Sequence, residues 1–238
     1  MNLKTEIKKL IGKVVPVDLF EKLTEYAIWQ KAEGFDLAGA RRIHVPGKTW
    51  LELVEKGREQ LWSEAIKYIG ITDVIFLEFG VWKGESIKFF GNLIKSEKSK
   101  LYGFDSFEGL PEQWRGMKEG HFSTKGQIPR SDDKRIQFIK GWFQNTLPNY
   151  VDTIANESKD RAVLIHLDAD LYSSTLFVLY TISQKIKQFY FIFDEFSGHE
   201  LRALYNFIQA SGSNVEFYRY IEYKGCPMTV FGKIRVTI

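Results

Sequence analysis

The feature that most constrains the fold is a succession of short apolar runs separated by stretches of helical spacing. The runs have the length and composition of buried parallel strands. Strands that alternate with helices form a mostly parallel sheet covered on both faces and joined by right-handed crossovers. We therefore predict a doubly wound α/β fold with strands at residues 74–79, 101–105, 135–140, 163–168 and 190–194. The expected helices between them include residues 86–94, 175–187 and 200–210.

The two ends of the chain follow other patterns. Apolar residues recur at helical spacing within residues 1–70, which we interpret as an N-terminal helical extension. The irregular stretch 34–47 inside it is a loop near a site or interface, or a plain connector. Residues 71–238 would form the main domain, and their last two strand-like runs, 215–223 and 228–236, predict an antiparallel hairpin.

Composition excludes several classes of protein. The chain has 33 Lys and Arg residues against 30 Asp and Glu residues, which is too balanced for nucleic-acid binding by electrostatics alone. Its single cysteine, Cys226, excludes an intrachain disulfide framework and is typical of a reducing, cytoplasmic setting. No apolar run is long enough to span a bilayer. We expect no nucleic acid and no membrane as partner, and the sequence leaves a homo-oligomer open.

Acidic residues and glycines gather where the expected strands end. In open α/β sheets, ligands bind beyond the carboxyl ends of the strands, where the strand order reverses. Carboxylates are costly to cluster there unless hydroxyls, amides or a cation meet them. The sequence therefore predicts a polar ligand site that includes Glu78, Gly80, Asp105, Asp168, Asp170, Asp194 and Glu195.

The turn after the first strand favours a particular kind of ligand. Gly80 and Gly84 allow a tight turn and a close backbone approach. The turn lacks the third glycine of dinucleotide-binding proteins and the Gly-Lys-Ser/Thr of a phosphate loop. A ligand with a ribose but no pyrophosphate suits it better, because Asp105 could accept hydrogen bonds from both ribose hydroxyls.

Four blocks of sequence resemble the macrocin O-methyltransferase family, which comprises bacterial enzymes that methylate sugar hydroxyls of natural products. They occur in the family's order at residues 78–81, 104–111, 141–148 and 166–175, within a resemblance over roughly residues 73–200. The resemblance implies S-adenosylmethionine as cofactor and a small hydroxylated molecule as methyl acceptor. We expect the cofactor to be bound by Glu78, Gly80, Ser86, Asp105, Ser106, Gly141, Trp142 and Asp168.

Two of these assignments leave alternatives. Glu78 would lie near the methionine end of the cofactor or hold the glycine turn. An aromatic side chain after the third strand, Trp142 or Phe143, could stack on adenine or belong to the core.

The resemblance also implies a magnesium site made by Asp168, Asp194 and Glu195. Magnesium binds carboxylate oxygens and could hold and activate the acceptor hydroxyl. The family's acidic pair is Asp-Asp, whereas this chain has Asp-Glu, and the longer side chain changes the expected geometry. Asp170 would support these ligands or cap the helix that starts near Ser173.

The catalytic residues expected are Asp168 and His199, either of which could take the proton from the acceptor. His121 is a further candidate for substrate contact or proton transfer; it lies in a long polar link, residues 106–134, that we expect to be a lid or binding loop. His166 is expected to be structural. Two alternatives remain. One is a metal-independent methyltransferase of this fold, and the other is a non-catalytic nucleotide-binding module, against which the retained acids argue.

Overall fold

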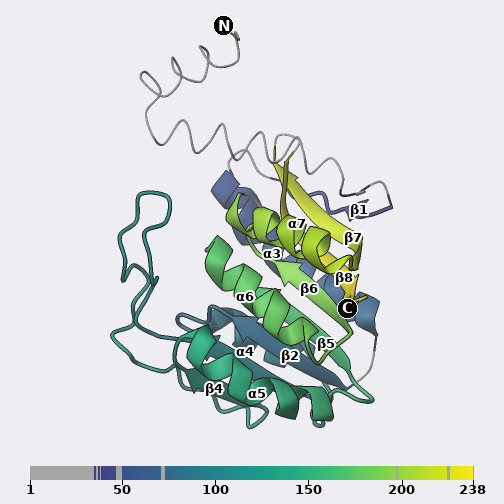
Figure 1. The fold of residues 1–238 in the computed structure, drawn as a ribbon. Coiled ribbons are helices and arrows are strands. Elements are labelled where there is room, and N and C mark those ends of the chain that lie inside the picture. Colours follow the sequence, from purple (N-terminus) through teal and green to yellow (C-terminus); the bar gives the residue numbers. More distant parts are fainter. Residues whose placement is uncertain are drawn as a thin grey trace, which may run out of the picture.

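An eight-stranded sheet runs through the molecule, as a computed structural model shows (Figure 1). The structure describes residues 35, 37, 39–46, 50–70, 73–196, 198–223 and 226–237. The strands lie in the order β1-β7-β8-β6-β5-β2-β3-β4. Their bounds are β1 Arg41–Arg42, β2 Val74–Phe79, β3 Lys100–Asp105, β4 Ile136–Lys140, β5 Ala162–Leu167, β6 Gln188–Phe193, β7 Asn214–Tyr223 and β8 Cys226–Arg235.

The strand order reverses at β2. This strand pairs in parallel with β3 on one side and with β5 on the other, and all six of its residues are buried. Its near-continuous apolar sequence fits a central strand covered on both faces. The reversal places the predicted ligand edge at the carboxyl ends of β2 and β5, and it confirms the doubly wound fold.

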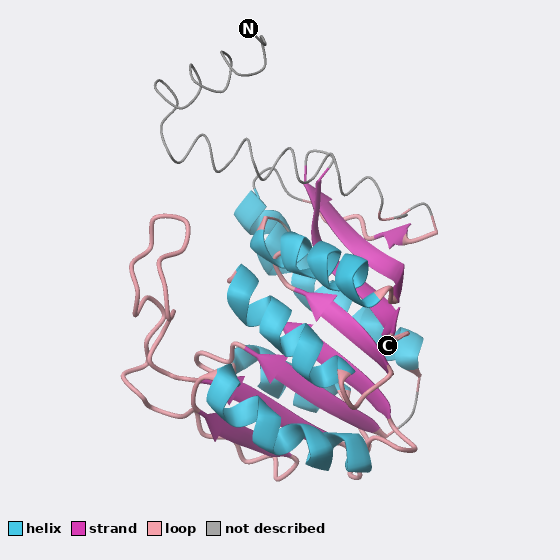
Figure 2. Cartoon of the chain, in the orientation of Figure 1, coloured by secondary structure: helices cyan, strands magenta, loops and turns pink. Residues whose placement is uncertain are grey.

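Helices cover both faces of the sheet (Figure 2). One core packs α5, α6 and α7 against the sheet, and the other packs α3 and α4 against the opposite face. Alternate residues of β2 serve the two cores: Ile75 and Leu77 belong to the first, and Val74 and Phe76 to the second. The helices are α3 Trp50–Ile69, α4 Glu85–Leu93, α5 Phe143–Glu157, α6 Tyr172–Ser183 and α7 His199–Ser211.

The predicted C-terminal hairpin is confirmed, because β7 and β8 pair antiparallel and β8 continues the sheet beside β6. Two local expectations need adjustment. A two-residue strand, β1, lies within the stretch expected to be irregular and pairs in parallel with β7. Helix α6 begins three residues earlier than expected, because Leu171, the residue before it, is buried against the link 106–134.

The predicted helices before residue 34 lie outside the described residues. Helix α3, which the sequence analysis placed in the N-terminal extension, packs in the same core as α4. Within the described part of the chain, no helix is long and apolar enough to cross a membrane.

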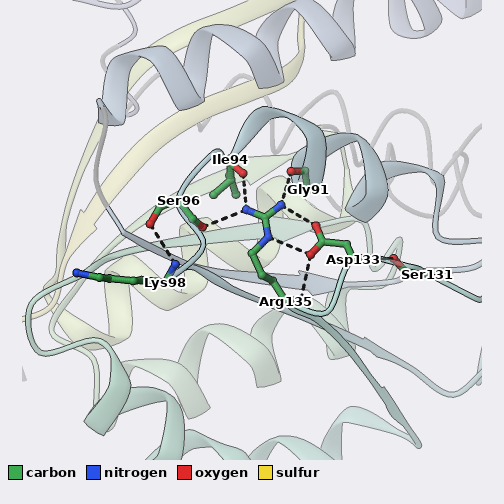
Figure 3. A network of polar contacts seen from close by, with 7 residues as sticks. All are labelled: Gly91, Ile94, Ser96, Lys98, Ser131, Asp133 and Arg135. Carbon is green, nitrogen blue, oxygen red and sulfur yellow. Dashed lines mark hydrogen bonds and ion pairs between the residues drawn. The ribbon is translucent and has the colours of Figure 1, made fainter.

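A clamp centred on Arg135 joins the start of β4 to the end of α4 (Figure 3). Its guanidinium donates to both carboxylate oxygens of Asp133, at 2.9 and 2.6 Å. It also donates to the carbonyl oxygens of Gly91, Ile94 and Ser96, at 2.7, 2.5 and 3.1 Å. The planar donor fork thereby satisfies carbonyls at and beyond the helix end that have no intrahelical partner.

Candidate active site

A cavity of about 520 Å³ lies at the carboxyl ends of β2, β3, β5 and β6. The link 106–134, teal in Figure 1, extends from this edge and contributes part of the wall. The predicted site residues that line the cavity are Gly80, Asp105, Ser106, Trp142, Asp168, Asp170, Asp194 and Glu195. Those outside its lining are Glu78, Ser86, Gly141 and His199.

The turn after β2 requires glycine at position 80. Gly80 has a φ of +93°, and a Cβ there would lie 1.9 Å from the carbonyl oxygen of Asp168. No other residue fits without displacing the backbone of the neighbouring strand end. This close approach sets the carboxyl end of β2 directly beside that of β5, where Asp168 follows the strand.

The carboxylate of Asp105 holds the same turn from the end of β3. One oxygen accepts the backbone N–H groups of Val81 and Trp82, at 2.7 and 2.8 Å. The other accepts the N–H of Phe107 at 2.6 Å. A carboxylate has about four acceptor positions, so Asp105 organises the turn and still borders the cavity.

Strained backbone gathers around the cavity. Trp82, Arg115, Phe122 and Asp170 all line it and all have positive φ angles, between 44° and 64°. Non-glycine residues adopt this conformation at a cost, and such residues concentrate at ligand sites. Two of them, Trp82 and Phe122, are exposed and contact each other edge to face at 6.0 Å.

Below the cavity, a histidine bridges two buried carboxylates. Nδ1 of His166 lies 3.0 Å from Oε1 of Glu78, and Nε2 lies 3.6 Å from Oδ1 of Asp194. Burial lowers the pKa of His166, but the two carboxylates outweigh it and raise that pKa to about 10. The imidazolium therefore carries a positive charge inside a cage that includes Trp62 and Phe90.

Glu78, expected near the methionine end of the cofactor or as a support of the glycine turn, lies at one end of this bridge. The side chain is fully buried beneath the turn, and its partner His166 lies opposite it in the β2–β5 register. Burial raises the pKa of Glu78, while His166 and then Ser86, in the first turn of α4, lower it.

Three further carboxyl groups on this edge have raised pKa values. Burial raises the pKa of Asp168 well above its usual value, and the charges of Asp194 and Asp170 raise it further. Burial and Glu195 raise the pKa of Asp170 to about 7. Glu200, buried in the first turn of α7, has a raised pKa because of burial and the charge of Asp168.

Two of the acids expected to bind magnesium face arginines. Nη1 of Arg58, on α3, lies 3.6 Å from Oδ2 of Asp194. Nη1 of Arg115, on the link 106–134, donates to Oε2 of Glu195 at 3.0 Å. Among the described residues, no group of three or more His, Cys, Asp or Glu side chains is arranged to hold a metal ion.

The link 106–134 is fastened to the chain segment after β5. Glu112 accepts a hydrogen bond from the hydroxyl of Ser173 at 2.8 Å. Leu110 and Trp114 pack against Leu171 in a small cluster of buried residues. The expected role of this link in forming the site is consistent with its place in the cavity wall.

Two aromatic residues, Trp142 and Phe143, follow β4, and they differ in how they contact the cavity and the core. Trp142 lines the cavity with 36% of its surface exposed. Phe143 also borders the cavity but packs edge to face on Phe79, with ring centroids 5.4 Å apart. Trp142 is therefore the better placed of the two to stack on a planar ligand.

The other expected roles have less support from geometry. His199 begins α7, is half-buried and does not line the cavity. His121 is exposed and packs on Phe122. Asp170 does not cap α6, because the cap residue is Leu171 and no side chain bonds the helix end.

Sequence reasoning missed Arg58, Arg115 and Glu200. The two arginines come from a helix and a loop distant in sequence from the strand ends, so only the folded chain brings them to the acids. A glutamate in the first turn of a helix is ordinary, and nothing in the sequence marks Glu200 as buried.

Comparison with known proteins links this chain to natural-product methyltransferases. The macrocin O-methyltransferase family model matches residues 46–214. A curated relative from Streptomyces olivaceus, 8-demethyl-8-(2,3-dimethoxy-alpha-L-rhamnosyl)-tetracenomycin-C 4'-O-methyltransferase, is 28% identical over 42% of this chain and 43% of its own length. Demethyldecarbamoylnovobiocin O-methyltransferase of Streptomyces niveus is 24% identical over 46% of this chain and 47% of its own. The match thus spans less than half of each relative.

Among solved structures, a TDP-rhamnose 3'-O-methyltransferase of calicheamicin biosynthesis aligns over 98% of this chain and 91% of its own, with a TM-score of 0.48 and 18% identity.

Proposed function

Because the chain belongs to the macrocin O-methyltransferase family, we propose that it transfers a methyl group from S-adenosylmethionine to a hydroxyl of a small sugar or natural-product acceptor. The observation that carries the proposal is the shared cavity. It brings Asp105, expected at the ribose, and Asp168, expected at the acceptor, into one space of small-molecule size.

The residues around the cavity fit the cofactor. Asp105, the last residue of β3, and Ser106, which follows it, offer polar groups for ribose hydroxyls, and Trp142 offers an aromatic face for adenine. S-Adenosylmethionine, when bound, supplies a methyl group on a positively charged sulfur. The carboxyl groups that follow β5 and β6 line the same cavity and supply polar oxygens to it.

Asp168 is the proposed general base. It is half-buried, borders the cavity and has a raised pKa, so its carboxylate is a stronger base than an exposed aspartate. The acceptor hydroxyl would give its proton to Asp168 while its oxygen takes up the methyl group, and the methyl–sulfur bond would break to leave S-adenosylhomocysteine. His199, the other candidate base, stands outside the cavity lining. The cavity walls would align the acceptor with the methyl group, which supplies much of the rate.

The implied magnesium ion does not fit the arrangement of the described acids. Such a site needs several oxygen ligands directed at one point. Here Asp194 faces Arg58 and His166, and Glu195 is bonded to Arg115.

Methyl transfer from radiolabelled S-adenosylmethionine to a panel of nucleotide sugars and glycosylated natural products tests the proposal. We expect Asp168→Asn to reduce transfer by about 10²-fold or more while the protein still binds S-adenosylhomocysteine. Asp152→Asn, an exposed aspartate on α5, is the matched control and should keep full activity. Unimpaired transfer by Asp168→Asn would contradict the assigned base.

A further inference from the structure

We propose that Arg58 and Arg115 occupy the position in which a divalent cation would neutralise Asp194 and Glu195, so that the chain supplies this positive charge itself. The inference rests on the proposed methyltransferase function, because it concerns the charge balance of that same site. It is built from ion pairs on three separate elements: α3, the link 106–134, and the segment after β6.

Protein side chains face Asp194 on both sides. Its Oδ2 lies 3.6 Å from Nη1 of Arg58, and its Oδ1 lies 3.6 Å from Nε2 of His166. Only 4% of the Asp194 side chain is exposed. A buried carboxylate needs an opposing charge, and Arg58 provides one.

Arg58 is held in place by more than this ion pair. Its guanidinium lies over the ring of Trp62, 5.5 Å from the ring centroid. Trp62 in turn packs edge to face on His166. The two side chains that face Asp194, those of Arg58 and His166, therefore contact the same tryptophan.

Arg115 reaches Glu195 from the link 106–134. It stacks over Trp114, 4.8 Å from the ring centroid, and donates to Glu195 at 3.0 Å. Trp114 belongs to the small cluster that fastens the link to Leu171. The left-handed backbone of Arg115, with a φ of 44°, directs its side chain from this anchored segment. A rigid anchor of this kind favours a fixed ion pair over a loose surface contact.

The longer side chain of Glu195 matters for this arrangement. A glutamate is one methylene longer than an aspartate, and Glu195 meets Arg115 of the link 106–134 at 3.0 Å. A guanidinium also differs chemically from a metal ion, because its donors lie in one plane and can bond a carboxylate and a substrate oxygen together. Asp168 is left facing the cavity, where a base is needed.

Binding of Mn²⁺, measured by electron paramagnetic resonance of the full chain, tests the inference without an acceptor. The wild type should bind Mn²⁺ weakly, and Arg58→Gln/Arg115→Gln, which removes both arginine charges, should bind it at least about tenfold more tightly. Arg41→Gln/Arg42→Gln is the matched control. It removes two arginine–carboxylate pairs on β1, and its Mn²⁺ affinity should equal that of the wild type.

Two outcomes would overturn the inference: tight Mn²⁺ binding by the wild type, or no gain in the double variant. If the double variant does not fold, the single variant Arg115→Gln must still bind Mn²⁺ more tightly than the wild type does. Titration with S-adenosylhomocysteine distinguishes a failure of the proposed methyltransferase function from a failure of the inference about the arginines. A folded chain that binds no S-adenosylhomocysteine contradicts the proposed function, whereas the Mn²⁺ result decides the role of the arginines by itself.

Discussion

The carboxylate of Asp105 accepts three backbone N–H groups from the turns after β2 and β3. Its position at a strand end follows from the sequence pattern, but these bonds do not. They depend on how the glycine turn folds back toward β3. The residue therefore links the shape of the turn to the ligand site, and its replacement should change both.

Asp105→Ala should weaken S-adenosylmethionine binding at least about tenfold, which corresponds to about 1.4 kcal/mol. The free energy of unfolding should fall by about 1–3 kcal/mol, because three backbone donors lose their acceptor. Calorimetric titration and urea unfolding measure the two effects. Asp132→Ala, at an exposed position in the link 106–134, is the control and should change neither. Cofactor affinity that survives in folded Asp105→Ala would remove Asp105 from the site.

His166 should be protonated well above neutral pH, because its pKa is raised to about 10. A histidine with a folded-state pKa above the unfolded value of about 6.5 stabilises the fold fully below that pH, and the contribution is lost as pH rises through about 10. Nitrogen chemical shifts of the imidazole at pH 8 should show both nitrogens protonated. A neutral imidazole at that pH would contradict the proposed bridge.

The histidine also marks a limit of sequence reasoning. The sequence suggested a structural role, yet the pairing of His166 with Glu78 depends on the register between β2 and β5. Register between strands 88 residues apart in the chain is set by tertiary packing, which the local pattern does not contain. The strand-end acids were predictable because each closes its own apolar run.

At the scale of elements, the Arg135 clamp joins the start of β4 to the end of α4 (Figure 3). All five guanidinium contacts lie on the side of the molecule away from the cavity, near the start of the strand. Local strand propensity predicts β4 itself. The clamp joins residues more than 39 positions apart and could not be read from that propensity.

Replacing Arg135 by Lys should lower the free energy of unfolding by about 2 kcal/mol, because an ammonium cannot satisfy the same planar set of acceptors. Lys134→Ala, the neighbouring exposed cation, should have an effect within about 0.5 kcal/mol. Urea unfolding measures both. The cofactor affinity of folded Arg135→Lys should match that of the wild type. If Arg135→Lys and the wild type have the same free energy of unfolding, the clamp does not stabilise the fold.

The link 106–134 illustrates a second limit at this scale. Its length and polarity favoured a functional loop, and the structure places part of it in the cavity wall. Its fastening by Glu112 and Leu110 to the start of α6 depends on contacts between segments about 60 residues apart. The same contacts explain why α6 begins earlier than its helical periodicity suggested.

At the scale of the whole molecule, the sequence was sufficient to predict the class of fold and the edge of the sheet at which the cavity lies. Alternating strands and helices specify a doubly wound sheet, and such a sheet has its ligand site where the strand order reverses. The structure confirms this order and places the cavity at the carboxyl ends of β2 and β5. The arginines that enter the site required the complete fold, since α3 and the link meet only there.

The central claim is that this cavity binds S-adenosylmethionine. Calorimetric titration of S-adenosylmethionine into the folded chain tests it most directly, with S-adenosylhomocysteine as competitor. We predict saturable binding at one site per chain that the competitor abolishes, and loss of affinity in Asp105→Ala but not in Asp132→Ala. A folded wild-type chain that shows no saturable binding, or binding indifferent to both the competitor and Asp105, would contradict the account.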